Sequence, residues 1–114
     1  MIAQRYRLSN DKQIKRVLHK GATKNGSFFR IKAMKNPRLR EFSRFTVIIS
    51  KKVSSKATVR NKIRRRIKAI FIKEVDKIAG YDFVVFPNIT AETADFIKLT
   101  EDARRCLRDL VSFS

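Results

Sequence analysis

The sequence runs Arg60-Asn61-Lys62-Ile63-Arg64-Arg65-Arg66-Ile67-Lys68 near its middle, with two isoleucines four positions apart among six cationic side chains. Apolar residues three or four positions apart are typical of an amphipathic helix, in which successive residues are turned by about 100°. One side of the helix predicted for residues 57–79 carries a stripe made of Val59, Ile63, Ile67, Ile70, Glu74 and Ile78. The opposite side carries Asn61, Arg64, Arg65 and Lys68. We therefore expect this helix to pack against a core while offering cations to a polyanion, of which nucleic acid is the commonest.

Positive charge dominates the whole chain and is concentrated in its first two thirds. The 28 Lys and Arg against 10 Asp and Glu give a formal net charge of +18. Residues 1–73 hold 23 basic and 2 acidic side chains, whereas residues 74–114 hold 5 basic and 8 acidic ones. Such asymmetry predicts a polyanion-binding region followed by a structural segment. A merely soluble basic protein is the weaker alternative, because charge this far from zero opposes compaction unless a partner neutralises it.

Length and composition indicate one domain spanning residues 1–114. A chain of 114 residues with 43% apolar residues can bury a modest single core. No apolar run approaches the roughly 18 residues of a membrane helix, and the N-terminus lacks the apolar stretch of a signal peptide, so we expect a cytoplasmic protein. The single cysteine, Cys106, excludes an internal disulfide and falls in an apolar helical pattern, which predicts a core residue.

Local patterns predict a chain that mixes helices and strands. In order we expect a helix at 10–20, strands at 27–34 and 44–51, the cationic helix at 57–79, a strand at 82–87 and a last helix from 100 to about 112. Ser9 or Asn10 would cap the first helix, and Gly21 and Gly80 would end the first and second helices. This order, α-β-β-α-β-α with one further short strand possible, is typical of an α+β fold.

Strand pairing and the last helix can also be predicted from local patterns. The two alternating strands are joined by a short connection, so we expect them to pair as antiparallel neighbours. The consecutive apolar residues of 82–87 predict a central strand buried on both faces. Residues 88–98 are expected to form a loop with a short helical turn, and Thr100-Glu101-Asp102 would cap the last helix.

Two further features favour nucleic acid as the partner. The loop before the cationic helix adds three more cations, Lys51, Lys52 and Lys56. These cations lead into a helix N-terminus, whose free N–H groups also attract phosphate. The first strand places Phe28, Arg30 and Lys32 on one face, and an aromatic ring with two cations suits a splayed single strand. Core packing explains Phe28 equally well.

Constellations of catalytic residues are missing from the sequence. The one histidine, His19, lies in a basic helix, and one histidine with one cysteine cannot form a typical zinc site. Only Asp11 and Glu41 offer carboxylates in the basic part of the chain, whereas a nuclease that uses two metal ions needs a cluster of them. We therefore expect no catalytic and no metal-binding residue here, and the polypeptide alone is not expected to cut a substrate.

Two stretches resemble a known family. Ser50-Lys51-Lys52, a short loop and then Ala57-Thr58-Val59-Arg60-Asn61-Lys62-Ile63-Arg64-Arg65-Arg66-Ile67-Lys68 look like the signature of the bacterial ribonuclease P protein subunit, which carries an Arg-Asn-Arg motif opening a basic helix. The opening Arg7-Leu8-Ser9-Asn10-Asp11, with Ile14, Val17-Leu18 and Lys20-Gly21, resembles the first helix of the same family. The resemblance extends over about residues 5–113.

The resemblance implies both a fold and a function. The fold would be an α-β-β-β-α-β-α sandwich with a left-handed β-α-β crossover, similar to one domain of a small-subunit ribosomal protein. The protein would be a subunit of an endoribonuclease ribonucleoprotein in which the catalytic RNA binds most of the Mg²⁺ and performs the chemistry. It would bind that RNA and the 5′ leader of precursor tRNA, and so assist the endonucleolytic removal of the leader that gives the mature tRNA 5′ end.

The resemblance also implies roles for individual residues. The surface that faces the catalytic RNA would comprise Lys51, Lys52, Lys56, Arg60, Asn61, Lys62, Arg64, Arg65 and Lys68. A cleft for the leader, between the first helix and the sheet, would comprise Ile14, Leu18, Phe28, Arg30 and Lys32. Ile14 and Leu18 stand where the family often has Phe. Lys62 replaces the last Arg of the motif, and lysine binds phosphate as a point charge without the bidentate fork of arginine.

Two other function classes fit parts of the sequence. A structural ribosomal protein that binds rRNA without catalysis would share the basic helix but would need no cleft for a leader. A DNA-binding regulator would need a helix-turn-helix pair with a short turn. The long polar loop and the strand before the cationic helix argue against that regulator.

Overall fold

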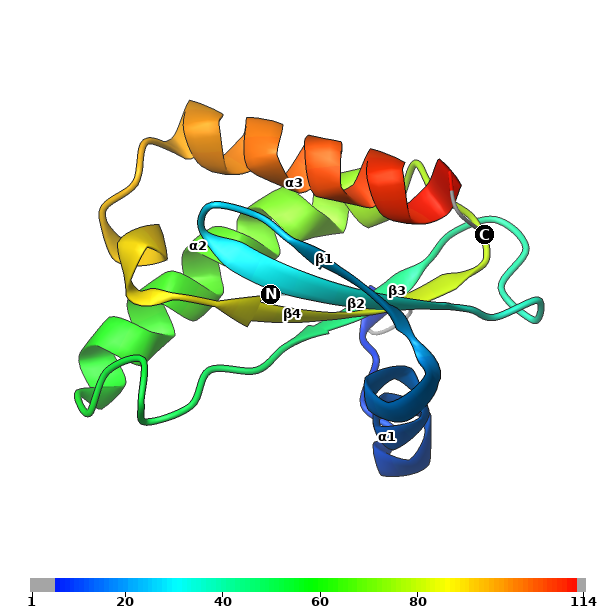
Figure 1. Ribbon diagram of the computed structural model, residues 1–114, viewed down its shortest axis with the longest axis horizontal. Coiled ribbons are helices and arrows are strands. Elements are labelled where there is room, and N and C mark those ends of the chain that lie inside the picture. Colours follow the sequence, from blue (N-terminus) through cyan, green and yellow to red (C-terminus); the bar gives the residue numbers. More distant parts are fainter. Residues whose placement is uncertain (1–5, 113–114) are drawn as a thin grey trace.

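A four-stranded sheet with helices on both faces makes up the computed structural model, which describes residues 6–112 (Figure 1). The elements are α1 (Asp11–Lys20), β1 (Ala22–Asn25), β2 (Phe29–Lys35), β3 (Arg44–Val47), α2 (Ala57–Val75), β4 (Tyr81–Pro87), the 3₁₀ helix η2 (Ile89–Glu92) and α3 (Phe96–Ser112). The helices α2 and α3 cover one face of the sheet, and α1 lies on the other (Figure 1). No helix of the described residues is long and apolar enough to cross a membrane.

The strands are ordered β1-β2-β4-β3, so the last strand in the chain lies inside the sheet. β4 pairs antiparallel with β2 and parallel with β3, and α2 forms the crossover between the parallel strands. The α-β-β-β-α-β-α order is confirmed, and the possible extra strand is β1. The predicted pairing of the strands at 27–34 and 44–51 is wrong. β4 is apolar at consecutive positions, so burial on both faces favours it in the central place that separates β2 from β3.

The main core lies between the sheet and the pair α2 and α3. The inward residues of β2, β3 and β4 meet the predicted apolar stripe of α2, whose Ile63, Ile67 and Ile70 are buried. Glu74 continues the stripe and is also buried, and its Oε1 accepts a bond of 3.1 Å from Nε of Arg104 on α3. The carboxylate can lie there because a cation from the neighbouring helix compensates it. Cys106 is fully buried in this core, which confirms its predicted place.

A smaller apolar cluster attaches α1 to the opposite face of the sheet. Its buried residues are Leu8, Val17 and Val84. The helix begins where the Asn10 side chain accepts the backbone N–H groups of the next turn, and it ends at Gly21, whose N–H donates to the carbonyl of Val17 at 2.8 Å. A side chain at position 21 would meet the carbonyls of Val17 and Ala33 at 2.5 and 2.9 Å. Both predicted ends of α1 are therefore confirmed, and the close approach of β2 explains the glycine.

The boundaries of α2 and α3 differ from the prediction. α3 starts at Phe96, because Asp95 caps it by accepting the N–H of Ile97 at 2.8 Å, so the cap predicted at Thr100-Glu101-Asp102 is wrong. Asp102 is instead buried within the helix. α2 ends at Val75, and Gly80, with φ +84°, forms the turn into β4. A positive φ of this size favours glycine. Gly80 therefore marks a turn, as expected, but the helix ends five residues before it.

Candidate nucleic-acid interface

The exposed side of α2 carries four cations and one amide close together, which we call the cationic face: Asn61, Lys62, Arg64, Arg65 and Lys68. Asn61, Lys62 and Arg65 are exposed, whereas Arg64 and Lys68 are half-buried. Nη1 of Arg64 donates to Oδ1 of Asn61 at 2.9 Å, which orients the guanidinium along the helix. Within residues 6–112, no acidic side chain forms an ion pair with the cations of this face. Their charge is therefore available to an external anion.

A groove runs beside the cationic face, between α2 and β3. It encloses about 660 Å³ and is lined by Arg7, Phe45, Thr46, Val47, Arg64, Arg65, Lys68, Ala69 and Ile72. A shallower hollow of about 530 Å³ continues toward the start of α2, over Thr58 and Asn61. Partial burial, and then the charges of Arg64 and Arg7, hold the pKa of Lys68 below its ordinary value. Because these cations repel one another, a phosphate bound among them would relieve the repulsion.

Sequence reasoning did not assign Arg7 to this surface. The segment before α1 lies along β3, with Leu8 N–H donating to the Phe45 carbonyl at 2.9 Å, and so Arg7 reaches the groove. The two stretches are far apart in the sequence, and no local pattern connects them. Only the residue's place in the quoted opening motif could have drawn attention to it.

Two arginines of α2 are already engaged in the protein. Nη1 of Arg60 donates to the Ser54 carbonyl at 2.8 Å and so fixes the loop before the helix. Arg66 donates to the carbonyls of Ala91 and Glu92 at 2.8 and 2.7 Å, and also to that of Ala94, and so holds η2 against α2. The predicted contact residues on the loop, Lys51, Lys52 and Lys56, are exposed. No side chain caps α2 and its first turn has no acidic residue, so the free N–H groups at its N-terminus add to the positive potential of the lysine loop.

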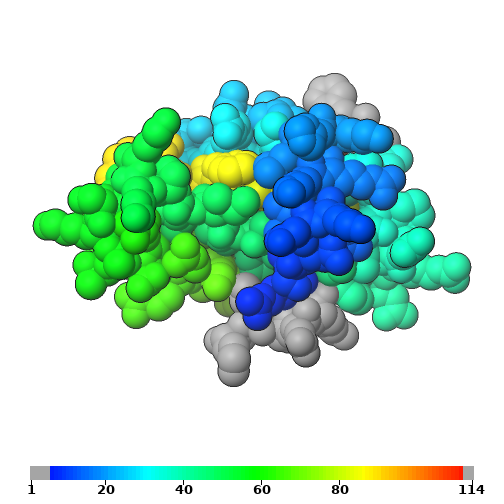
Figure 2. All heavy atoms as spheres, turned by 90° about the horizontal axis from the view of Figure 1, so that it is seen from below, coloured from blue at the N-terminus to red at the C-terminus, as the bar shows by residue number. Residues whose placement is uncertain are grey.

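The face of the sheet that carries α1 gathers a second group, which we call the α1-side patch: Ile14, Leu18, Arg30, Lys32 and Phe86. The guanidinium carbon of Arg30 lies 4.9 Å from the ring centroid of Phe86, its partner in the neighbouring strand. Nζ of Lys32 donates to the carbonyl of Leu18 at 3.0 Å, near the end of α1. In Figure 2, which views this face, the yellow end of β4 is visible between blue α1 and the green chain that leads into α2. Four of the five predicted cleft residues therefore share this face.

Phe28 is the exception, and of its two predicted places the structure favours the core. It lies just before β2 and packs against the main core, and its N–H donates to Oδ2 of Asp102 on α3 at 3.1 Å. In a strand, side chains two positions apart lie on the same face, which would place Phe28 beside Arg30. Phe28 does not follow this rule, because β2 begins only at Phe29. Phe86 supplies the aromatic ring of the patch instead. It was expected to be buried on both faces, but it is half-exposed.

The described residues contain no obvious site for a metal ion. No group of three or more His, Cys, Asp or Glu within residues 6–112 could hold one. His19 is exposed, and burial raises the pKa of the Cys106 thiol, which favours its neutral form.

The similar sequences and structures described below belong to one family. The model of the family Ribonuclease P matches residues 2–111. The ribonuclease P protein component of Carboxydothermus hydrogenoformans is 27% identical over 95 residues, which cover 82% of this chain and 81% of the relative. That of Helicobacter acinonychis is 30% identical over 107 residues, which cover 81% of this chain and 69% of the relative.

Solved structures show the same fold. The ribonuclease P protein from Thermotoga maritima matches with a TM-score of 0.77 and 27% identity, over 90% of this chain and 96% of that one. The ribonuclease P protein of Staphylococcus aureus matches with a TM-score of 0.76 and 24% identity, over 91% of this chain and 94% of that one. The mixed α+β architecture with four strands and three α-helices is therefore shared with these proteins.

Proposed function

Since this chain belongs to the Ribonuclease P family, we propose that it binds a catalytic RNA with the cationic face and the 5′ leader of precursor tRNA with the α1-side patch. The family match makes it a protein component of ribonuclease P. The relatives and structures described above are all ribonuclease P proteins, so we do not propose the rRNA-binding alternative. In this proposal the protein assists the endonucleolytic removal of the leader, which leaves the mature tRNA 5′ end.

The observation that carries the proposal is the division of the molecule into two chemically different surfaces. Among residues 6–112 the cations of the cationic face have no acidic partner, which suits the regularly spaced phosphates of a folded RNA. Arginine forks there can bind phosphate oxygens bidentately, and the Asn61 amide can bind a base edge or a 2′-hydroxyl. Lys51, Lys52 and Lys56 extend this surface at the start of α2.

The α1-side patch suits a single strand instead. Ile14 and Leu18 offer apolar side chains, and Phe86 offers a ring beneath the Arg30 guanidinium. Bases stack on aromatic and guanidinium planes, while Arg30 and Lys32 lie within the same patch to neutralise the backbone. A short unpaired leader fits this chemistry, because its bases are free to contact side chains, whereas those of a duplex are stacked inside it.

We further propose that the Mg²⁺ ions of the reaction are bound mainly by the RNA subunit. The carboxylates of this chain do not fit a metal site in the described residues. The role left to the protein is to bind both RNAs, to orient the precursor tRNA and to reduce the repulsion between it and the catalytic RNA. Each phosphate that it neutralises releases counterions, and this favours assembly at moderate salt.

Reconstitution tests the proposal. Protein freed of nucleic acid should not cleave precursor tRNA, whereas adding a bacterial ribonuclease P RNA and Mg²⁺ should restore cleavage at moderate salt. Arg65→Ala should weaken binding to that RNA, and Lys73→Ala, an exposed change at the far end of the same helix, is the matched control. Cleavage by protein that has been rigorously freed of RNA, or equal binding losses for both variants, would contradict the proposal.

A further inference from the structure

A third hollow lies on the flank of α1 opposite the α1-side patch, and we call it the far-flank pocket. It encloses about 380 Å³ and is lined by Gln13, Arg16, Val17, Met34, Lys35, Asn36, Pro37, Arg38 and Asp82. The buried Val17 lies under the helix, with Ile14 and Leu18 on one side of it and Gln13 and Arg16 on the other. The pocket is therefore separated by α1 from the surface proposed for the leader.

Three cations from three different parts of the fold surround the far-flank pocket. Arg16 comes from α1, Lys35 from the end of β2 and Arg38 from the turn that follows it. All three are exposed, and within residues 6–112 none of them forms an ion pair with an acidic side chain. Cations gathered in this way without a counter-charge attract an anion.

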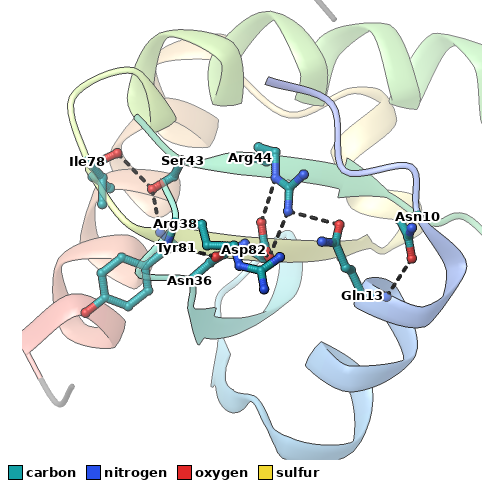
Figure 3. Close-up of polar contacts among 9 residues, drawn as sticks. All are labelled: Asn10, Gln13, Asn36, Arg38, Ser43, Arg44, Ile78, Tyr81 and Asp82. Atoms are coloured by element: carbon teal, nitrogen blue, oxygen red, sulfur yellow. Dashed lines mark hydrogen bonds and ion pairs between the residues drawn. The ribbon is translucent and has the colours of Figure 1, made fainter. Parts of the chain in front are cut away.

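The one acidic residue in the wall does not cancel this charge. Asp82 is buried, and Arg44 grips its carboxylate with two bonds, Nε to Oδ1 at 3.0 Å and Nη2 to Oδ2 at 3.2 Å (Figure 3). The Asn36 amide adds a third donor to Oδ2 at 3.0 Å (Figure 3). Since Asp82 is already paired inside the protein, the outward-facing charge of the pocket is that of Arg16, Lys35 and Arg38.

The turn that carries Arg38 is held in place by its own hydrogen bonds. Asn36 N–H donates to the Gly80 carbonyl at 2.7 Å, and the Asn36 carbonyl accepts the Leu39 N–H at 3.0 Å. Oδ1 of Asn36 accepts the Arg38 N–H at 3.2 Å. A backbone fixed before binding reduces the ordering cost that a mobile loop would incur. Arg38 is thus presented beside the pocket by a pre-organised turn.

From this arrangement we propose that the far-flank pocket binds a phosphate group of an RNA backbone, with Arg16 and Arg38 as its main ligands. The site rests on the proposed function, because the partner is an RNA of the ribonuclease P complex. It adds a point of attachment on the other side of α1, so that the helix lies between two bound RNA segments. The phosphate belongs either to the catalytic RNA or to the body of precursor tRNA, and the experiment separates these sources.

The test compares two double variants with the same change in charge. Arg16→Glu with Arg38→Glu reverses both proposed ligands. Lys12→Glu with Arg40→Glu reverses one exposed cation on α1 and one just after the turn that carries Arg38, and neither of them lines the pocket. Binding of each protein to a bacterial ribonuclease P RNA, and binding of each reconstituted complex to precursor tRNA and to mature tRNA, are measured over a range of salt concentrations.

The expected result is a larger effect of the pocket variant. It should bind one of the two RNAs roughly tenfold more weakly than the control variant does, and its salt slope should fall by about 0.9 for each phosphate that it no longer neutralises. Weaker binding in the first assay identifies the catalytic RNA as the source, and weaker binding of both tRNAs in the second identifies the tRNA body. Equal effects of the two double variants, or no effect in either assay, would overturn the site while leaving the proposed function intact. Failure of the unaltered protein to bind the RNA would overturn both.

Discussion

The arginines of α2 differ in what their side chains already contact, so charge alone does not assign their roles. Arg66 places its guanidinium on the carbonyls at the end of η2, whereas Arg65 is exposed and lines the groove beside β3. Adjacent residues of the same type therefore differ: the side chain of Arg66 is bound within the protein, whereas that of Arg65 is exposed and is proposed to bind RNA.

Replacing each of these arginines by alanine should separate the two roles. Arg66→Ala should lower the free energy of unfolding by about 1.5–3 kcal/mol, the range for bonds that involve a charged group. Arg65→Ala should change stability by less than about 0.5 kcal/mol, but it should lower the salt slope of RNA binding by about one unit. Urea unfolding and RNA titrations on both variants check this. Equal destabilisation by the two changes would show that the bonds of Arg66 do not hold η2.

The two phenylalanines at positions 28 and 86 allow stability to be separated from leader binding in the same way. Phe86→Ala should weaken binding of precursor tRNA by about 1–3 kcal/mol, the value of one base stacked on an aromatic ring, and should spare mature tRNA. Replacing a fully buried phenylalanine by alanine lowers the free energy of unfolding by about 3–5 kcal/mol. Phe28→Ala should lower it by less, because Phe28 is only half-buried in the main core.

The matched measurement is the ratio of affinities for precursor and mature tRNA, with a melting curve for each variant. Phe28→Ala should leave this ratio unchanged among the molecules that remain folded. A ratio altered by Phe28→Ala and not by Phe86→Ala would place the leader on the opposite face of the sheet.

Among the elements, α1 depends most on interactions outside itself. Its ten residues are fewer than the about 12–15 that make an isolated helix even marginal, and Val17 is its one buried residue. Two polar interactions hold its ends: Nη2 of Arg44 donates to Oε1 of Gln13 at 3.0 Å (Figure 3), and Lys32 donates to the carbonyl of Leu18. The first is strong because Arg44 is itself fixed on Asp82.

Breaking the hydrogen bond at Gln13 should therefore loosen α1 while the sheet stays intact. Gln13→Ala should speed amide hydrogen exchange in α1 and lower the preference for precursor over mature tRNA. Gln13→Glu should restore both, since a carboxylate accepts the same bond from Arg44. Lys12→Ala, at the exposed position just before Gln13, is the control. Unchanged exchange in Gln13→Ala would mean that Val17 and the Lys32 hydrogen bond suffice to hold the helix.

Local sequence patterns predicted the helices and strands themselves better than they predicted which elements pack or pair with one another. The apolar stripe of α2 and the cap at Asn10 depend on residues close in sequence. The cap is confirmed, and the stripe is confirmed as far as Glu74, whereas Ile78 lies beyond the helix. The pairing of β2 with β4 depends on which strand gains most from burial, which no single segment reveals. For the same reason Arg7 and Phe86, placed by chain segments distant in sequence, were missing from the predicted sites. The start of α3 was misplaced because Asp95 and Thr100-Glu101-Asp102 are both plausible caps.

For the whole molecule, the number of phosphates that its cations neutralise sets how binding responds to salt. If the cationic face, its loop and the far-flank pocket together neutralise about 6–10 phosphates, affinity for the catalytic RNA should fall by about 10³–10⁵ between 50 and 200 mM salt. Titration at several concentrations of monovalent salt checks this slope. A nearly flat response would mean that the excess charge of +18 is not used in binding.

The central place of β4 also bears on how the chain is made. Neither β2 nor β3 has its main partner until residues 81–87 have been synthesised, because β4 lies between them. At about 5–20 residues per second, the ribosome needs several seconds to pass from the end of β2 to the end of β4. By the end of that time all 23 basic residues of positions 1–73 have been added to a chain that still has no folded sheet to arrange them. We therefore expect the nascent chain to be a polycation before its proposed RNA-binding surface has formed, and to bind surrounding nucleic acid unspecifically during that interval.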